Sequence, residues 1–331
     1  MKVIIPVAGI GSKLRPHTHT QPKTLLPIAG KPMLSHIVDS LIDGGLRDFV
    51  FVLGYLGDKI EDFITTRYKE INAEFVTQEP REGSAHAIWV CREYIRHEKE
   101  ILIVLGDTIA SFNLKEMLAS PYSVLGVLKV ANPLQFGIAE MNNEGFIQKL
   151  IEKPRIPKSN LALVGIYKII NPMLLLDSIE YIIQNNIKIN NEYYLTDALM
   201  KMIEEGEKMK TIQVDNWFDC GKKETLLEAN AILLNINKHR QQIPENLEDS
   251  IIIPPVSIGL NCKISHSIIG PNVAVGENTI LKNTILSDSI IGAYSELKDV
   301  VLKHSIVGND TSIRGLSQSL NIGDNTEISF E

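Results

Sequence analysis

The sequence predicts an α/β fold in which a mixed, mostly parallel sheet is followed by a small left-handed parallel β-helix. Two patterns support this prediction. Up to about residue 240, short β-rich runs alternate with amphipathic helical segments. That alternation is typical of right-handed crossovers that cover both faces of a parallel sheet. Toward the end of the chain, an apolar residue followed by glycine recurs at a short, regular interval, which is typical of a β-helix.

The first region contains the strands and helices of the predicted sheet. Apolar, β-branched runs predict strands at residues 2–7, 48–53, 73–77, 101–105, 123–130 and 161–169. Helical periodicity predicts helices at residues 33–43, 58–68, 84–94, 114–119 and 222–239. The turn sequence Asn142-Asn143-Glu144-Gly145 stands between two alternating runs and predicts a hairpin, which makes the sheet mixed. In Rossmann-like sheets of this kind, ligands bind at the carboxyl ends of the strands.

The last region has a hexapeptide-like repeat. Its apolar-glycine pairs recur every 15 to 17 residues, and another apolar residue follows each pair at a fixed distance. The first set is Ile258, Val275, Ile291, Val307 and Ile322, and the second is Ile264, Leu281, Leu297, Ile313 and Ile328. About five coils of a β-helix are therefore expected. A β-sandwich with coincidental spacing is the alternative.

We expect three segments along the chain. A chain of 331 residues exceeds what a single hydrophobic core usually organises. The alternating region would form a large domain at residues 1–240, and the polar stretch RQQIPENLEDS would begin a connector at residues 241–255. Residues 256–331 would then form the β-helix.

The composition argues against several classes of function. A formal net charge of −7 does not suit a broad nucleic-acid-binding surface. No window approaches the ~20 uninterrupted apolar residues that a membrane helix needs, and the apolar run at the N-terminus is too short for a signal peptide. The three cysteines are widely spaced and form no C-x-x-C pair. We therefore expect a cytoplasmic protein in a reducing compartment, without nucleic-acid or membrane partners.

A glycine-rich loop, VAGIGSKLRPHTHTQPKTLLP at residues 7–27, follows the first predicted strand. The dinucleotide fingerprint fails there because Leu14 occupies the place of its third glycine. The Walker A pattern also fails, since Leu14 rather than Ser or Thr follows Lys13. Two interpretations remain open from the residues alone. Gly9 and Gly11 let backbone amides approach an anion that nearby cations neutralise, or the loop is a solvated basic turn.

The stretch AGIGSKLRPHTHTQPKTLLPIAGKPML resembles the signature of the sugar-phosphate nucleotidyltransferases, which include glucose-1-phosphate thymidylyltransferases and UDP-sugar pyrophosphorylases. Further motifs similar to that family follow in the same order: QEPREGSAHAI, LGDT, FG, EKP, VGIY, NEYYLTD and WFDCG. The resemblance covers essentially the whole chain, including a hexapeptide tail that several members have. It implies a sheet of the nucleotide-diphospho-sugar transferase type. It also implies nucleotidyl transfer from an NTP to a hexose 1-phosphate, with release of pyrophosphate.

The resemblance further implies a role for each matching residue. Lys13 and Lys23 would be the catalytic cations, and Asp107 and Asp219 the metal ligands. The residues implied on the nucleotide side are Ala8, Gly9, Gly11, Gln78, Gly83 and Ser84. Those implied on the sugar-phosphate side are Gly137, Glu152, Lys153 and Val164. The segment NEYYLTD is similar to one that closes the sugar wall.

These residue types suit the reaction on chemical grounds as well. A sugar 1-phosphate oxygen is already anionic, so its attack on the α-phosphorus of an NTP needs positioning and charge neutralisation rather than a general base. Two aspartates at strand ends suit Mg²⁺, which prefers oxygen ligands. Lysines neutralise the charge that develops on the departing pyrophosphate. We therefore expect Mg²⁺ as the cofactor, and an NTP and a sugar 1-phosphate as substrates.

One position departs from the family pattern, which usually has Thr-Arg where this chain has Ser12-Lys13. Arginine grips phosphate oxygens through a planar fork, whereas lysine is a point charge on a flexible stem. We hypothesise that Lys13 still binds phosphate, because lysine is itself a common phosphate ligand.

Several alternatives stay open from the sequence. Gln78 favours dTTP or UTP, because its amide can both donate and accept against the imide edge of a pyrimidine. The alternative to metal binding by Asp107 is that this residue only caps the next helix. The alternative to sugar-phosphate binding by Glu152 and Lys153 is that they form an exposed ion pair. A catalytically weakened binding homologue and a bifunctional enzyme with an acyltransferase β-helix are the other functions considered. We favour a structural β-helix in a homo-oligomer, because stacked coils offer flat faces for subunit contact.

Overall fold

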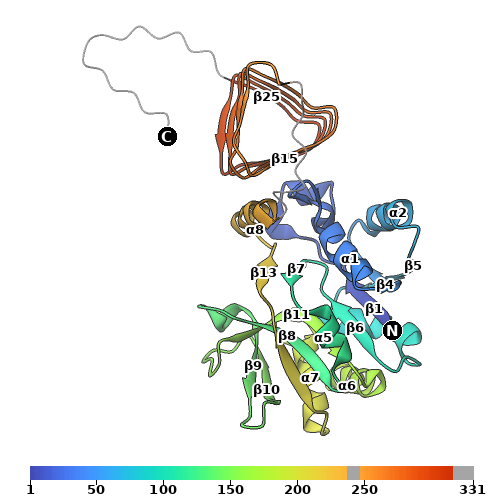
Figure 1. The fold of residues 1–331 in the computed structure, drawn as a ribbon. Helices are drawn as coiled ribbons and strands as arrows, with labels where there is room; N and C mark the ends of the chain where they lie inside the picture. Colours follow the sequence, from blue (N-terminus) through green and yellow to red (C-terminus); the bar gives the residue numbers. More distant parts are fainter. Residues whose placement is uncertain (237–246, 316–331) are drawn as a thin grey trace. The chain divides into compact units, whose positions relative to one another are not determined.

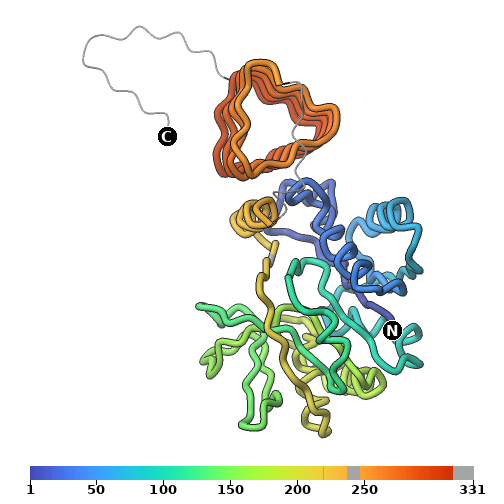
Figure 2. Tube along the Cα trace, viewed as in Figure 1, coloured from blue at the N-terminus to red at the C-terminus, as the bar shows by residue number. Residues whose placement is uncertain are grey.

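The structure is a computed structural model that describes residues 1–236 and 247–315, apart from the side chain of Asp219 (Figures 1 and 2). The chain divides into two compact units, Met1–Ala229 and Asn230–Glu331. In the described part, no helix combines the length and the apolar character needed to cross a bilayer.

A mixed sheet lies at the centre of the first unit. Its strands are β1 (Lys2–Pro6), β4 (Asp48–Leu53), β5 (Asn72–Thr77), β6 (Ile101–Val104), β8 (Ser123–Lys129), β9 (Gly137–Met141), β10 (Ile147–Glu152), β11 (Leu161–Ile169) and β12 (Met209–Gln213). They run in the order β10-β9-β11-β6-β1-β4-β5, with β8 and β12 branching from β11. The strands β6, β1, β4 and β5 are parallel, whereas β11 is antiparallel to β6. The predicted hairpin is confirmed, since β9 and β10 pair antiparallel around residues 142–145.

Helices flank this sheet (Figure 1). They are α1 (Met33–Asp43), α2 (Gly57–Arg67), α3 (Ser84–Val90), α4 (Arg92–Ile95), α5 (Leu114–Ala119), α6 (Pro172–Gln184) and α7 (Leu195–Glu204). The last helix, α8 (Lys223–Ile236), begins in the first unit and ends in the second. Helix α3 packs on β1 and contacts both α6 and α7, and these elements share one buried apolar cluster. The start of α3 is thereby held next to the start of α7.

Short elements complete the first unit around the strand ends. They are the 3₁₀ turns η1 (Ser12–Leu14), η2 (His17–His19), η3 (Lys23–Leu25) and η4 (Pro133–Gln135), and the strands β2 (Pro27–Ile28), β3 (Lys31–Pro32), β7 (Thr108–Ser111) and β13 (Asn216–Asp219). The turns η1, η2 and η3 all lie in the glycine-rich loop, which is therefore folded on itself rather than an extended basic arm.

The predicted helix at residues 84–94 is divided in the structure into α3 and α4. The amide of Cys91 donates to Ile88 O and that of Tyr94 donates to Cys91 O. These bonds span three residues instead of four, so the helix tightens at Cys91 and changes direction. The predicted helix at residues 222–239 is α8, whose final residues 237–239 lie outside the described part.

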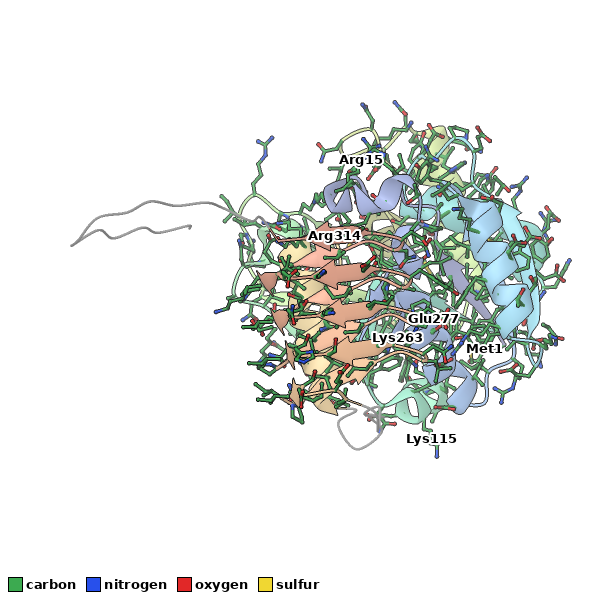
Figure 3. All side chains as sticks on the ribbon, turned by 90° about the horizontal axis from the view of Figure 1, so that it is seen from above. Met1, Arg15, Lys115, Lys263, Glu277 and Arg314 are labelled. Atoms are coloured by element: carbon green, nitrogen blue, oxygen red, sulfur yellow. The ribbon has the colours of Figure 1, made fainter. Side chains whose placement is uncertain are left out.

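In the described part of the second unit, the repeat folds into three parallel four-stranded sheets, which is consistent with the predicted left-handed β-helix. They are β14 (Ile251–Ile252), β17 (Ile268–Ile269), β20 (Ile285–Ser287) and β23 (Val301–Lys303); β15 (Val256–Ile258), β18 (Val273–Val275), β21 (Ile290–Ile291) and β24 (Ile306–Val307); and β16 (Lys263–Ser265), β19 (Ile280–Lys282), β22 (Glu296–Lys298) and β25 (Ser312–Arg314). The coils trace a triangle in Figure 2, and Figure 3 labels Arg314 on the last described coil. The repeat residues from Ile258 to Val307 fill the interior, whereas Ile322 and Ile328 lie outside the described residues.

The β-helix interior gives a stability prediction. Leu281 is 0% exposed and Val301 is 72% exposed. Leu281→Ala leaves a cavity between coils and should cost about 2–5 kcal/mol, whereas Val301→Ala should change stability by less than about 0.5 kcal/mol. Both tryptophans, Trp89 and Trp217, lie in the first unit.

Urea unfolding followed by circular dichroism and by tryptophan fluorescence checks this expectation. Leu281→Ala should lower the midpoint of a transition in circular dichroism and leave the fluorescence midpoint in place. Equal midpoints for the Leu281 and Val301 variants would contradict the assignment of Leu281 to the coil interior.

Candidate functional site

Two adjoining cavities open where β1 and β6 end, in the first unit. The loop cavity, of about 520 Å³, is lined by residues that follow β1, including Gly9 and Gly11. The bulge cavity, of about 250 Å³, is lined by Val164 and Gly165 of β11. The residues that line both are Ser84, Leu105, Asp107 and Tyr194. The two cavities therefore share a wall.

The loop cavity brings together most residues that the sequence assigned to the nucleotide side. Its lining includes Ala8, Gly9, Gly11, Lys23, Gln78, Gly83 and Ser84. Gly11 has a φ of 67°, a left-handed conformation that glycine adopts without strain. The Thr18 hydroxyl donates to Gly11 O at 2.8 Å, which fixes that turn. Lys13 does not line the cavity, although Ser12 does; the Lys13 side chain is exposed in η1.

An ion pair lies at the junction of the two cavities. Lys23, in η3, places its Nζ 2.6 Å from Oδ2 of Asp107, which follows β6. The Lys23 side chain is 12% exposed, whereas 41% of the Asp107 side chain remains open to the cleft. Desolvation alone would raise the pKa of the Asp107 carboxyl, but the charge and hydrogen bond of Lys23 outweigh it and hold that pKa below its usual range. Asp107 is therefore an ionised carboxylate, and the part of it that is open to the cleft can bind a cation.

The Gln78 side chain does not have both ends of its amide free to contact a nucleotide base. Its side chain is only 5% exposed, and its Nε2 donates to Gly83 O at 2.9 Å and lies 3.3 Å from His86 Nδ1. The amide nitrogen therefore holds the loop before α3. The carbonyl oxygen of Gln78 is the atom of this amide that suits the imide N–H of a pyrimidine.

The bulge cavity forms at an irregularity in β11. Pairing with β8 shifts between Leu163 and Tyr167, so Val164 and Gly165 leave the regular ladder and line the cavity. Gly165 O still accepts a bond from Leu105 N at 2.9 Å. This bond ties the irregular segment to the loop that follows β6.

A polar cluster closes the bulge cavity. Thr196 donates from Oγ1 to Glu152 Oε2 at 2.7 Å, and Gly137 lies against this bond. Lys153 donates from Nζ to the Tyr194 hydroxyl at 2.8 Å and lies 3.8 Å from Glu152 Oε1. Tyr194, which lines both cavities, thus holds the Lys153 ammonium, although Lys153 itself is not among the residues that line either cavity.

The carboxyls of this cluster are less acidic than usual. Burial raises the pKa of Glu152, although its bonds to Thr196 and Lys153 partly oppose the rise. Burial and the charge of Glu152 raise the pKa of Asp197 to about 6. The Oδ2 atom of Asp197 is buried and has no hydrogen-bond partner among the described residues. Like charges in a poorly solvated place account for both shifts.

The second aspartate of the predicted metal site is placed by its backbone. Strand β13 pairs antiparallel with β7, and Asp219 lies opposite Thr108, the residue after Asp107. The Asp219 side chain lies outside the described part of the structure. Among the described residues there is no group of three or more His, Cys, Asp or Glu side chains that would hold a metal by itself. Mg²⁺ commonly takes one or two carboxylates and completes its shell with water and substrate phosphates, so these residues fit that ion.

Sequence reasoning missed several residues of the site. Arg81 and Glu192 line the loop cavity, Thr196 lines the bulge cavity, and Tyr194 belongs to the wall shared by both. The motif NEYYLTD contained the only signal for the last three, because it matched the family without indicating which side chains face the cleft.

Comparisons with known proteins agree with this arrangement. A family model described as "Nucleotidyl transferase" matches residues 2–236. The bifunctional protein GlmU of Methanocaldococcus jannaschii is 36% identical over 255 residues, which are 76% of this chain and 59% of that protein. The low-salt glycan biosynthesis nucleotidyltransferase Agl11 of Haloferax volcanii is 29% identical, and the alignment covers 99% of each chain.

A solved structure supports the fold of the first unit. The crystal structure of a UDP-glucose pyrophosphorylase complexed with UDP-glucose is similar with a TM-score of 0.62 and 24% identity, over 71% of this chain and 98% of that one. The chain spans about three-fifths of the M. jannaschii relative, whose alignment covers 59% of its length. The cleft at the carboxyl ends of β1 and β6 and the match over residues 2–236 together place this chain in the nucleotidyl transferase family.

Proposed function

We propose that this protein transfers a nucleotidyl group from an NTP to a hexose 1-phosphate, giving an NDP-sugar and pyrophosphate. The observation that supports this most strongly is the shared wall of the two cavities. Asp107 of this wall pairs with Lys23 of the loop cavity. Tyr194 of the same wall accepts a hydrogen bond from Lys153, which lies outside both cavity linings. Two anionic substrates bound in the two cavities would therefore each have a lysine close to the wall that they share.

The proposed reaction needs no proton transfer at its central step. An oxygen of the sugar 1-phosphate attacks the α-phosphorus, the bond from that phosphorus to the bridging oxygen breaks, and pyrophosphate leaves. Lys23 would neutralise the phosphates in the loop cavity, and the backbone around Gly11 would approach them. Lys153 would hold the sugar phosphate. Mg²⁺, with Asp107 and Asp219 as protein ligands, would when bound supply further neutralisation of phosphoryl charge.

Sugar recognition would depend on the bulge cavity. The Glu152 carboxylate is fixed by Thr196 and would accept hydrogen bonds from sugar hydroxyls. The backbone of Gly137 and Val164, which line the same cavity, would complete the contacts. Positioning of this kind is where a phosphoryl-transfer enzyme gains most of its rate.

The finer assignments remain part of the proposal. dTTP or UTP is favoured as nucleotide, because Gln78 lines the loop cavity and its amide oxygen would accept from the imide N–H of a pyrimidine. The known complex with UDP-glucose of a similar fold agrees with a pyrimidine nucleotide. We further propose that residues 1–240 form the catalytic region, residues 241–255 a connector and residues 256–331 the β-helix. The β-helix would provide the contacts between subunits of a homo-oligomer.

A pyrophosphate-release assay tests the function directly. Five NTPs are each combined with the 1-phosphates of glucose, mannose, galactose and N-acetylglucosamine in the presence of Mg²⁺. We expect release with dTTP or UTP and at least one of these sugars, and loss of release when EDTA is added. Nucleotide binding without release from any pair would instead favour a binding homologue without catalysis.

The two lysines of the loop give a graded prediction. Lys23→Ala should lower the rate of pyrophosphate release about 10²- to 10³-fold, because it removes a fixed positive charge where phosphate charge develops. Lys13→Ala should lower the rate of pyrophosphate release less than Lys23→Ala, since Lys13 is exposed and lies outside the cavity lining. Lys13→Arg keeps the positive charge and should have the rate of the wild type. Lys31→Ala is the control, because it breaks a similar lysine–aspartate pair, with Asp39, away from both cavities. An unchanged rate in Lys13→Ala would remove Lys13 from the site.

The raised pKa of Glu152 predicts a pH-dependent affinity for the sugar. Below the pKa of Glu152 its carboxyl is protonated and accepts hydroxyl bonds weakly, so KM for the sugar 1-phosphate should rise as the pH falls through that pKa. Thr196→Val removes the hydrogen bond that lowers the pKa of Glu152, so this pKa should increase and the rise in KM should move to higher pH.

Steady-state measurements between pH 5 and pH 8, with each substrate varied in turn, check the expected shift. KM for the nucleotide serves as the internal reference. The assignment fails if both KM values rise together, or if Thr196→Val moves the rise to lower pH.

A further inference from the structure

Hydrogen bonds join the loop before α3 to the segment before α7. Tyr193 N donates to Glu82 O at 2.7 Å, and Ala85 N donates to Tyr193 O at 2.9 Å. On the outer side, Lys188 pairs with Glu82 at 2.9 Å. A segment of the loop cavity is therefore fixed to a segment of the bulge cavity along its backbone.

Gly83 makes this close approach possible. Its φ of 102° lies in the left-handed region, and a Cβ atom there would lie 2.5 Å from Tyr193 O and 2.8 Å from Tyr193 N. Any other residue would push the two segments apart. The approach places the next side chain, that of Ser84, at the first turn of α7.

Ser84 caps α7 from a distant part of the sequence. Leu195 N, the first amide of the helix, donates to Ser84 Oγ at 2.9 Å across 111 residues. The first amides of a helix have no acceptor within it, and Tyr194, at the N-cap position, makes no side-chain cap bond. Ser84 therefore supplies the acceptor that an N-cap side chain ordinarily provides.

The first turn of α7 also sets the position of the Glu152 carboxylate. Thr196, next to Leu195, is 6% exposed and donates to Glu152 at 2.7 Å. The Glu152 side chain is 9% exposed, so this carboxylate has little freedom to move. A shift of the helix start would carry Thr196 and Glu152 with it.

We propose that Ser84 is a positioning residue for the sugar 1-phosphate: by capping α7 from the loop cavity, it fixes Thr196 and, through it, the Glu152 carboxylate of the bulge cavity. The inference rests on the proposed function. Ser84 also lines the loop cavity. A molecule bound in that cavity is therefore coupled, through Ser84 and the start of α7, to the position of the Glu152 carboxylate in the bulge cavity.

Kinetics of Ser84 variants separate positioning from nucleotide contact. One hydrogen bond contributes about 1 kcal/mol, which corresponds to roughly a fivefold change in affinity. Ser84→Ala should raise KM for the sugar 1-phosphate about fivefold and change KM for the nucleotide less than about twofold. Ser84→Thr keeps an oxygen acceptor and should restore the affinity. Ser40→Ala, in α1 and away from both cavities, is the matched control and should behave as wild type.

A double-mutant cycle tests the route through Thr196. If Ser84 acts through Thr196, Ser84→Ala should add little to the KM change of Thr196→Val, because both act on the same carboxylate. Two results overturn the proposal: a rise in nucleotide KM as large as that for the sugar, or multiplication of the two KM effects in the double variant.

Amide hydrogen exchange at Leu195 gives a readout that does not depend on turnover. Loss of the cap should make this amide exchange faster in Ser84→Ala and leave it unchanged in Ser40→Ala. Unaltered exchange at Leu195 in Ser84→Ala overturns the positioning role even if the enzyme is active. Absence of pyrophosphate release from wild type with every pair tested is a separate result, which refutes the proposed function and not the cap.

Discussion

The ion pair between Lys23 and Asp107 is the contact around which the cleft is organised. It joins the loop after β1 to the loop after β6 at 2.6 Å, and these strands are adjacent and parallel. A bond from Gly106 N to Pro6 O at 3.1 Å ties the loop after β6 to the last residue of β1. Ion pairs out of bulk water contribute little net stability, because desolvation offsets attraction. The main effect of the pair is therefore to fix a positive and a negative charge side by side where the two cavities meet.

Strong local apolar patterns explain why so much of the fold could be predicted. Residues 48–53, 161–169, 33–43 and 114–119 have the bounds that the sequence predicted, because each has a strong apolar period flanked by turn residues. Helices α6 and α7 and strands β7, β12 and β13 were not predicted from the sequence. The two helices are amphipathic, so their periodicity was a usable signal, whereas the three strands are short. Strand β13, for example, is defined by its pairing with β7 about a hundred residues away in the chain, which no local pattern reports.

In the site, too, local sequence patterns identify some residues, whereas the roles of others depend on contacts between distant parts of the chain. Lys23 and Asp107 follow strands that could be recognised, so their meeting at one edge of the sheet could be anticipated. Thr196 and Tyr194 could not be assigned, since their roles depend on contacts with Glu152 and Lys153 from another strand. Lys13 matched the family pattern by position, yet it is exposed in η1; alignment gives the place of a residue and not the direction of its side chain.

The irregularity in β11 joins the walls of the two cavities. Val164, Gly165 and Ile166 together oppose Gly126 alone, and regular pairing resumes on either side. A bulge of this kind bends its strand and re-aims the side chains at that point. The same segment is held by β6, because Gly165 O accepts from Leu105 N and Ile166 pairs with Val104. A substitution in this segment would therefore reshape the bulge cavity and disturb the loop that carries Asp107, so the two cavities are constrained to change together.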